Sequence, residues 1–297
     1  MFYKKSGKKL DSRIKNRIEL ELGEKIISQN SVSGGCINDA RIITTKANKQ
    51  YFVKLNYNHP SDMFRKESNG LIEIKKSNSI RIPEVFFVND DFIILEVIKS
   101  GTRKKFFFEE FGSRFALMHK FYGKSFGFYE DNYIGSNIQK NIPDDEDKNN
   151  WIKFFFNKRL YFQFKLAEQN GYASEELRKL FVKLENKIDT ILNSEIEKPS
   201  LLHGDLWSGN YMVDENGEAC LIDPAVYYGN READLAMTKL FGGFDQKFYN
   251  AYQEAYPLLD GYNYRENIYK LYHVLNHLNL FGMGYYGQAI DLIEYYL

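Results

Sequence analysis

Two stretches carry the most informative pattern of this chain: Leu201-Leu202-His203-Gly204-Asp205-Leu206-Trp207-Ser208-Gly209-Asn210, and then Cys220-Leu221-Ile222-Asp223-Pro224. Asp205 and Asn210 are five positions apart, and Asp223 lies thirteen positions beyond Asn210. Between the two stretches, an Asn216-Gly217 dipeptide flanked by apolar residues is a strong signal for a β-hairpin. A hairpin would bring Asn210 and Asp223 together, so we expect these two residues to share one site.

The spacing H-x-D-x-x-x-x-N, followed by a further Asp, is typical of the catalytic loop and the metal-binding aspartate of kinase-like phosphotransferases. Phosphoryl transfer needs a hydroxyl aimed at the γ-phosphorus and divalent cations that neutralise the phosphates. Asp205 is the candidate base, because an Asp can accept the hydroxyl proton. Asn210 and Asp223 are the candidate Mg²⁺ ligands, because this cation prefers hard oxygen donors.

Composition limits the classes of protein that this chain can be. Its 297 residues suit two packed lobes, and a hydrophobic content of 43% is enough for a sizeable core. A net charge of +0 argues against a nucleic-acid binder that relies on bulk charge. No apolar run approaches a membrane span, and residues 1–5 lack the apolar core of a signal peptide. We expect a cytoplasmic monomer or homodimer without nucleic-acid or membrane partners.

The first third of the chain is predicted to be rich in strands. A helix is expected over 11–22, and β-branched or aromatic runs follow at 26–27, 40–45, 51–55, 85–88 and 92–97. Gly34 and Gly35 lie between the first two runs, where paired glycines permit close approach of the backbone to a phosphate. The full G-x-G-x-x-G pattern is absent, and glycines at strand turns are usually only turns.

Lys54 ends the third run, and Glu67 lies in the second turn of a helix predicted over 62–76. In kinase-like folds such a pair holds a lysine against the α- and β-phosphates. The two residues could also be unrelated exposed charges, but the downstream loop favours an ion pair. Glu96 to Ile98 then falls where a hinge would offer backbone groups to adenine.

The rest of the chain is predicted to be mainly helical. Helices are expected at 106–120, 151–171, 174–192, 232–241, 246–256, 265–280 and 284–297, and residues 123–143 are expected to form a loop. His119, at the end of the first of these helices, is interpreted as structural in preference to a substrate contact. The boundary between the two lobes is predicted at residues 98 and 99, with a nucleotide-binding lobe over 1–98 and a catalytic and substrate lobe over 99–297.

The chain resembles the fructosamine kinases, or ketosamine 3-kinases, from about Ser33 to its C-terminus. The supporting stretches are 34–38, 51–54, 80–83, 132–135, 159–160, 199–210, 222–229, 234–244 and 271–282. The His-Gly-Asp and Asn pair also occurs in aminoglycoside and choline kinases. The Trp207-Ser208-Gly209-Asn210 tail and the run from Leu275 to Gly282 are much more specific to this family.

The resemblance implies a protein-kinase-like α+β fold with two lobes, a small N-terminal lobe with an antiparallel sheet and a larger, mainly helical C-terminal lobe. It implies ATP- and Mg²⁺-dependent phosphorylation of ketosamines, typically on the sugar 3-hydroxyl, which links the family to protein deglycation. Asp205 would then be the base, and Lys54, held by Glu67, would grip the nucleotide phosphates. The backbone of Gly34 and Gly35 would cover them.

Three further residues receive supporting roles. Asp234 lies where kinase-like folds place an acid that hydrogen-bonds the backbone of the catalytic loop, and His203 belongs to the same loop. Trp207 lies beside the base, where an indole face could carry the apolar face of a sugar. Packing between the loop and a helix is an equally good interpretation of Trp207.

Two features concern regulation. Asp223 is followed by Pro224, and the segment over 224–231 is too short for a phosphorylatable activation loop, so we predict a kinase that needs no activation by phosphorylation. Its main substrate is then not a protein hydroxyl. Cys36 lies in the presumed phosphate loop, where a lowered thiol pKa would allow redox control, including a disulfide between two chains. An inert residue is the favoured alternative in a reducing compartment.

Two other functions stay open. A related kinase for an aminoglycoside or choline would be marked by a strongly acidic acceptor pocket. A catalytically dead nucleotide-binding module would usually have lost one of five residues, all of which are present: Lys54, Glu67, Asp205, Asn210 and Asp223.

Overall fold

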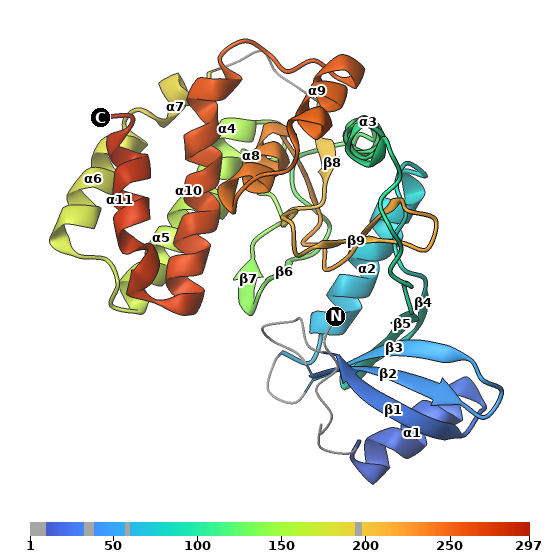
Figure 1. Cartoon of the computed structure of the whole chain (residues 1–297). Coiled ribbons are helices and arrows are strands. Elements are labelled where there is room, and N and C mark those ends of the chain that lie inside the picture. The colour runs from blue at the N-terminus through green and yellow to red at the C-terminus, as the bar shows by residue number, and fades with distance from the viewer. Residues whose placement is uncertain (1–9, 33–38, 57–59, 194–197) are drawn as a thin grey trace.

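The computed structural model describes residues 10–32, 39–56, 60–193 and 198–297, and the chain folds into two lobes (Figure 1). The smaller lobe holds a sheet near the N-terminus, and the larger lobe is mainly helical. This confirms the expected fold class. The lobe boundary at residues 98 and 99 stays a prediction.

The first lobe is built on one antiparallel sheet with the strand order β1-β2-β3-β5-β4. Its strands are β1 (Ile26–Val32), β2 (Asp39–Thr45), β3 (Gln50–Leu55), β4 (Val85–Val88) and β5 (Phe92–Glu96). All five predicted runs are therefore confirmed as strands. Helix α1 (Ser12–Leu22) precedes them; the Asp11 side chain accepts a hydrogen bond from the Arg13 amide at its start, and Gly23, with φ of 66°, ends it.

The two faces of this sheet pack against different helices. One cluster joins α1 to the sheet through Ile18, Ile43, Val53, Leu55, Phe92 and Ile94. Another joins α2 (Met63–Lys76) to the opposite face through Phe64, Leu71, Ile93 and Leu95. Because successive side chains of a strand point to opposite faces, Lys54 lies between Val53 and Leu55 but faces α2. Strand alternation thus aims Lys54 at the helix that carries Glu67.

The second lobe packs helices around one large core. Its helices are α3 (Phe107–His119), α4 (Trp151–Phe155), α5 (Phe162–Gln169), α6 (Glu175–Glu185), α7 (Ile188–Ile191), α8 (Glu232–Leu240), α9 (Gln246–Ala255), α10 (Tyr262–Phe281) and α11 (Tyr286–Glu294). A π-helical segment, η1 (Phe156–Tyr161), joins α4 to α5, and a 3₁₀ turn, η2 (Met283–Tyr285), joins α10 to α11. The predicted helices are confirmed in place, but the one expected over 151–171 contains this π-helical segment, and the one expected over 174–192 is divided into α6 and α7 at residues 186–187.

Three short antiparallel pairs lie among these helices. They are β6 (Asn132–Ile134) with β7 (Asn137–Gln139), β8 (Ser200–Leu202) with β11 (Tyr227–Gly229), and β9 (Tyr211–Val213) with β10 (Ala219–Leu221). The β9–β10 hairpin confirms the prediction from Asn216-Gly217. The expectation of a loop over 123–143 was wrong for β6 and β7, because three-residue strands carry too few residues for a visible alternation.

Arg81 links the two lobes. Its guanidinium forms ion pairs with Glu96 in the first lobe and with Asp214 and Glu215 at the β9–β10 turn of the second. Its carbonyl accepts a hydrogen bond of 2.9 Å from the Leu221 amide. The hinge region and the hairpin beside the catalytic loop are thereby held together. Among the described residues, no helix combines the length and apolarity needed to cross a membrane.

Candidate active site

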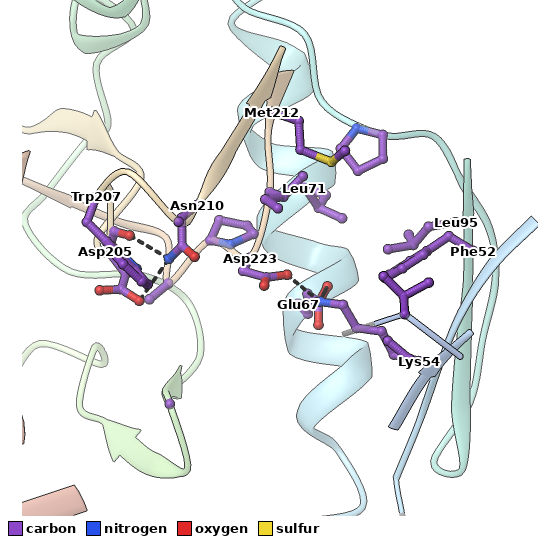
Figure 2. A pocket seen from close by; sticks show the side chains of 18 of the residues that line it. Phe52, Lys54, Glu67, Leu71, Leu95, Asp205, Trp207, Asn210, Met212 and Asp223 are labelled. Carbon is purple, nitrogen blue, oxygen red and sulfur yellow. Dashed lines mark hydrogen bonds and ion pairs between the residues drawn. The ribbon is translucent and has the colours of Figure 1, made fainter. Parts of the chain in front are cut away.

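A cavity of about 1180 Å³ lies where the two lobes meet. Strands β1, β2, β3 and β5 and helix α2 line it from the first lobe. The β6–β7 hairpin, the loop after β8, the β9 strand and the end of α10 line it from the second. Figure 2 shows Asp205 and Asn210 at the second lobe, with Asp223 between them and Lys54. Residues from distant parts of the sequence therefore meet in one place.

Lys54 and Glu67 form an ion pair, with 2.6 Å between Nζ and Oε1. The Lys54 ammonium also contacts the Asp223 carboxylate. Burial disfavours the charged ammonium, but the two carboxylates outweigh this cost and raise the pKa of Lys54 above its usual value. Lys54 therefore stays protonated at physiological pH.

Asn210 holds Asp205 in place. Its Nδ2 donates to the Asp205 backbone carbonyl at 2.7 Å and to Oδ2 of the Asp205 side chain at 3.1 Å. Since both amide hydrogens point towards Asp205, the Asn210 amide oxygen is left for another partner. Burial raises the pKa of Asp205 well above its usual range, against the hydrogen bond from Asn210, and the nearby Asp223 raises it further. A carboxylate with a raised pKa is a stronger base.

His203 and Asp234 hold the backbone of residues 203–205, in the loop that carries Asp205. The carboxylate of Asp234 accepts hydrogen bonds from the amides of His203 (2.6 Å) and Gly204 (2.8 Å). The His203 ring accepts from the Asp205 amide at Nδ1 and lies 3.0 Å from the Ile222 carbonyl at Nε2, so Nε2 carries the proton. Burial lowers the pKa of His203, which keeps this ring neutral.

His119 completes the same buried network. Its ring lies 3.3 Å from Asp234 Oδ2 and 2.7 Å from the Tyr252 hydroxyl, and no part of the side chain is exposed. His119 is not part of the cavity lining, and the interpretation of it as a structural histidine stays a prediction.

Asn210 and Asp223 offer a fitting pair of Mg²⁺ ligands. The Ile222 amide donates to the Asn210 carbonyl at 3.0 Å, and the β9–β10 hairpin brings Asn210 next to the segment that carries Asp223. The Asp223 backbone has a left-handed φ of 54°. The described residues contain no cluster of three or more His, Cys, Asp or Glu side chains that could hold a metal. Mg²⁺ is usually bound by one or two protein oxygens, with phosphate oxygens and water as its other ligands. An amide oxygen from Asn210 and a carboxylate oxygen from Asp223 match this preference.

We call the end of the cavity beside Lys54, where the nucleotide is expected, the nucleotide end, and the end beside Trp207, where the acceptor is expected, the acceptor end. The nucleotide end also contains apolar side chains that the sequence analysis did not single out. Phe52, Leu95 and Met212 line it (Figure 2). Strand alternation could have identified Phe52, because it faces the same side of β3 as Lys54. The three hinge residues Glu96, Val97 and Ile98 line the cavity, the Glu96 side chain is engaged by Arg81, and the Glu96 amide donates to the Glu84 carbonyl at 2.9 Å. Adenine binding at the hinge stays a prediction.

The acceptor end is lined by rings. Trp207 is half-buried and lies with its ring centroid 6.0 Å from that of Phe241, which in turn lies 4.9 Å from the ring of His277. A Cβ on Gly209 would lie 2.4 Å from the Trp207 indole, so the indole packs closely over this glycine. Trp207 thus packs on its own loop and also faces the cavity, and both interpretations of it keep their support. Phe241 and His277 were missed as site residues, because their helices show only ordinary apolar spacing.

Three predicted residues, Gly34, Gly35 and Cys36, lie outside the described part of the chain. The other cysteine, Cys220, is fully buried in strand β10. Burial raises the pKa of its thiol to about 12, so Cys220 is not a reactive thiolate at neutral pH.

Comparison with known proteins identifies the relatives of this chain. A family model described as fructosamine kinase matches residues 10–297. A chloroplastic protein-ribulosamine 3-kinase from Arabidopsis thaliana is 41% identical over 274 residues, which cover 90% of this chain and 82% of the relative.

Comparison with solved structures points to the same family. A protein from Haemophilus somnus assigned as a fructosamine-3-kinase superimposes with a TM-score of 0.84 at 29% identity, covering 96% of each chain. APH(2'')-IIa, solved with streptomycin and ATP, gives a TM-score of 0.62 at 17% identity over 97% of each chain, and this likeness shows a shared kinase-like fold. The match of the family model across both lobes, together with the Arabidopsis relative, shows that the chain belongs to the fructosamine kinase family.

Proposed function

We propose that the protein transfers the γ-phosphoryl group of ATP to the sugar 3-hydroxyl of ketosamines of the ribulosamine or fructosamine type. The observation that carries this proposal is the convergence of Asp205, Asn210, Asp223 and the Lys54–Glu67 ion pair on one cavity. These side chains supply the base, the metal ligands and the phosphate-binding cation that phosphoryl transfer requires. The family and the ribulosamine 3-kinase name of the Arabidopsis relative supply the acceptor.

In this mechanism, Asp205 accepts the proton of the attacking hydroxyl. Its raised pKa suits that task, and the Asn210 amide fixes the direction of its carboxylate. Lys54 binds the nucleotide phosphates, and Glu67 keeps its ammonium aimed into the cavity. Asn210 and Asp223 would hold Mg²⁺, which neutralises phosphate charge during the reaction. Phe52, Leu95 and Met212 exclude water around the adenine.

The charges along the cavity favour a ketosamine over an aminoglycoside. Among the described residues that line the cavity there are four carboxylates: Glu67, Glu96, Asp205 and Asp223. Glu67 and Glu96 are paired with Lys54 and Arg81, and the other two belong to the proposed chemistry. No carboxylate of this described lining is left over for a polycationic acceptor, whereas the rings of Trp207 and Phe241 suit the apolar face of one sugar.

A supporting role in protein deglycation follows from this proposal, because phosphorylated ketosamines break down and release the amine. The expected cytoplasmic location stays a prediction, since the Arabidopsis relative is named as chloroplastic. Oligomeric state and redox control through Cys36 also stay predictions.

A panel of acceptors tests the proposal. ADP release should be measured with a ribulosamine, a fructosamine, kanamycin and choline, each with wild type and with Asp205→Ala. We expect turnover on the two ketosamines, none above background on the others, and loss of the ketosamine activity in the variant. Turnover on kanamycin or choline alone would replace the proposed acceptor, and ADP binding without turnover on any acceptor would favour a dead module.

A further inference from the structure

The β6–β7 hairpin joins a buried chain of amides to the segment that follows Asp223. Gln139 donates from Nε2 to the Ala225 carbonyl at 2.9 Å, and Asn132 donates from Nδ2 to the Val226 carbonyl at 2.8 Å. Gln139 Nε2 also donates to Asn132 Oδ1 at 2.8 Å. Both side chains are at most 4% exposed. The hairpin therefore hydrogen-bonds to the backbone two and three residues beyond Asp223, the proposed metal ligand.

The direction of every bond in this chain of amides is fixed by its ends. Arg159 has no acceptor, and its Nη2 donates to Asn141 Oδ1 at 2.7 Å, so the Asn141 amide must donate onward to Asn132 Oδ1. At the other end, the Ala225 carbonyl can only accept, so Gln139 Nε2 must face it, and Gln139 Oε1 then accepts from the Tyr272 hydroxyl at 2.7 Å. Asn132 and Gln139 are thereby left with their amide hydrogens facing Val226 and Ala225. A buried network with all of these bonds made holds one arrangement.

Ala225 is held through both of its backbone polar groups. Its amide donates to the His203 carbonyl at 2.8 Å while its own carbonyl accepts from Gln139. Gly204 lies so close that a Cβ there would be 1.9 Å from the Ala225 oxygen. Only Pro224, whose ring fixes its φ, separates Ala225 from Asp223. The backbone of Asp223 is therefore separated by one residue from an anchored position, while its carboxylate contacts Lys54.

The same hairpin region also anchors the helix that carries Glu67. The Tyr133 hydroxyl donates to Asp62 Oδ1 at 2.7 Å, and Asn69 Nδ2 donates to Glu130 Oε1 at 2.8 Å. Helix α2 and the segment after Asp223 are thus held by one short hairpin and the residues that lead into it. An arrangement of this kind would make a phosphorylatable activation loop unnecessary.

We propose that Gln139 and Asn132 are positioning residues, which hold the backbone at Ala225 and Val226 so that Asp223 is ready to bind the metal. This inference rests on the proposed function only in taking Asp223 as a metal ligand. A purely structural role would instead make every bond of the network equal in effect. Tyr272→Phe is the matched control, because it removes a buried hydrogen bond to the same Gln139 side chain on the side away from Ala225.

The test measures the binding of Mn²⁺ to the intact protein in the presence of ADP and without an acceptor. Binding is detected as a decrease of the EPR signal of free Mn²⁺. Gln139→Met should weaken Mn²⁺ binding about tenfold, as is usual when a supporting partner of a metal ligand is lost. Tyr272→Phe should leave it within twofold, although both variants lower the melting temperature. Asp223→Asn should abolish the binding.

Gln139→Ala also removes the donor to Ala225 but leaves no bulky apolar group against the two carbonyl oxygens, so it serves if Gln139→Met does not fold, and the same tenfold loss is expected. Mn²⁺ binding within twofold of wild type in a folded Gln139 variant, an equal loss in Tyr272→Phe, or unchanged binding in Asp223→Asn would overturn the proposal. A wild type that binds Mn²⁺ and ADP but phosphorylates no ketosamine would overturn the proposed acceptor and leave this inference standing.

Discussion

The two ends of the central cavity are held by different forces. At the nucleotide end, ion pairs fix the geometry: Lys54 with Glu67 and Asp223, and Arg81 with Glu96. At the acceptor end, the described lining consists mainly of rings and amides, with Trp207 and Phe241 in edge contact. Phosphates demand fixed charge, whereas a sugar can be held by shape, so the first end is common to a reaction class and the second decides the acceptor.

This contrast has a kinetic consequence. Variants at the nucleotide end should alter the KM for ATP, and variants at the acceptor end should alter the KM for the ketosamine. Asp205 lies between the two ends and should alter turnover without altering either KM.

The largest effect is expected for Asp205→Asn. Removal of a general base usually costs roughly 10²–10⁴ in rate, so kcat should fall by that factor. ADP affinity, measured by calorimetry, should stay within threefold, because Asp205 does not bind the nucleotide in this account. A kcat within tenfold of wild type would remove Asp205 from its role.

Lys54→Met comes next. It removes the cation that binds the phosphates, and a charge-assisted interaction of about 3 kcal/mol corresponds to a fall of about 10²-fold in kcat/KM for ATP. The KM for the ketosamine should change little. Lys66→Met is the control: Lys66 also lines the cavity from α2, but its ammonium is bound to the Asp131 carbonyl. Equal losses in the two variants would argue against a special role for Lys54.

The pH dependence should separate the two ends as well. Burial favours the neutral form of Asp205, so its pKa is raised, and the base loses its charge as the pH falls through that raised value. With a ketosamine as the varied substrate, kcat/KM should therefore decline about tenfold per pH unit on an acid limb well above about 3.9, the usual value for Asp. ADP binding should show no such limb, because the raised pKa of Lys54 keeps it charged. An acid limb centred near 3.9 would contradict this account.

The smallest effect is expected for Trp207→Leu. An aromatic contact contributes about 1 kcal/mol beyond its buried area, so the KM for the ketosamine should rise about fivefold while the KM for ATP stays unchanged. Trp151 provides a control within the same chain, because it is buried in the core and donates to the Tyr269 hydroxyl. Trp151→Phe should lower the melting temperature and leave both KM values unaltered. A raised KM for ATP in Trp207→Leu would place the indole at the wrong end.

The Lys54–Glu67 ion pair was predictable from the sequence for a physical reason. Lys54 and Glu67 lie in elements with clear periodicity, and a strand lysine and a helix glutamate that precede a catalytic loop are typical of a phosphate-binding pair. The Asn216-Gly217 turn likewise indicated that Asn210 and Asp223 meet, because turn chemistry is local.

The acceptor end and its support could not be predicted in the same way. Strands β6 and β7 have three residues each, and Asn132, Gln139 and Asn141 gain their meaning only from partners far along the chain. Phe241 lies against Trp207, and His277 lies against Phe241, through the packing of α8 and α10, which no local pattern encodes. The sequence alone therefore did not predict the hydrogen bonds and ring contacts that join residues far apart in the chain.

The most direct test of the central claim is to identify the product. Wild type should be incubated with ATP, Mg²⁺ and a ribulosamine of an N-blocked lysine, and the product examined by proton–phosphorus correlation NMR. This account predicts a phosphomonoester on the 3-hydroxyl of the sugar, absent with Asp205→Asn. A phosphate on another hydroxyl, or no phosphorylated sugar while ADP still binds, would contradict it.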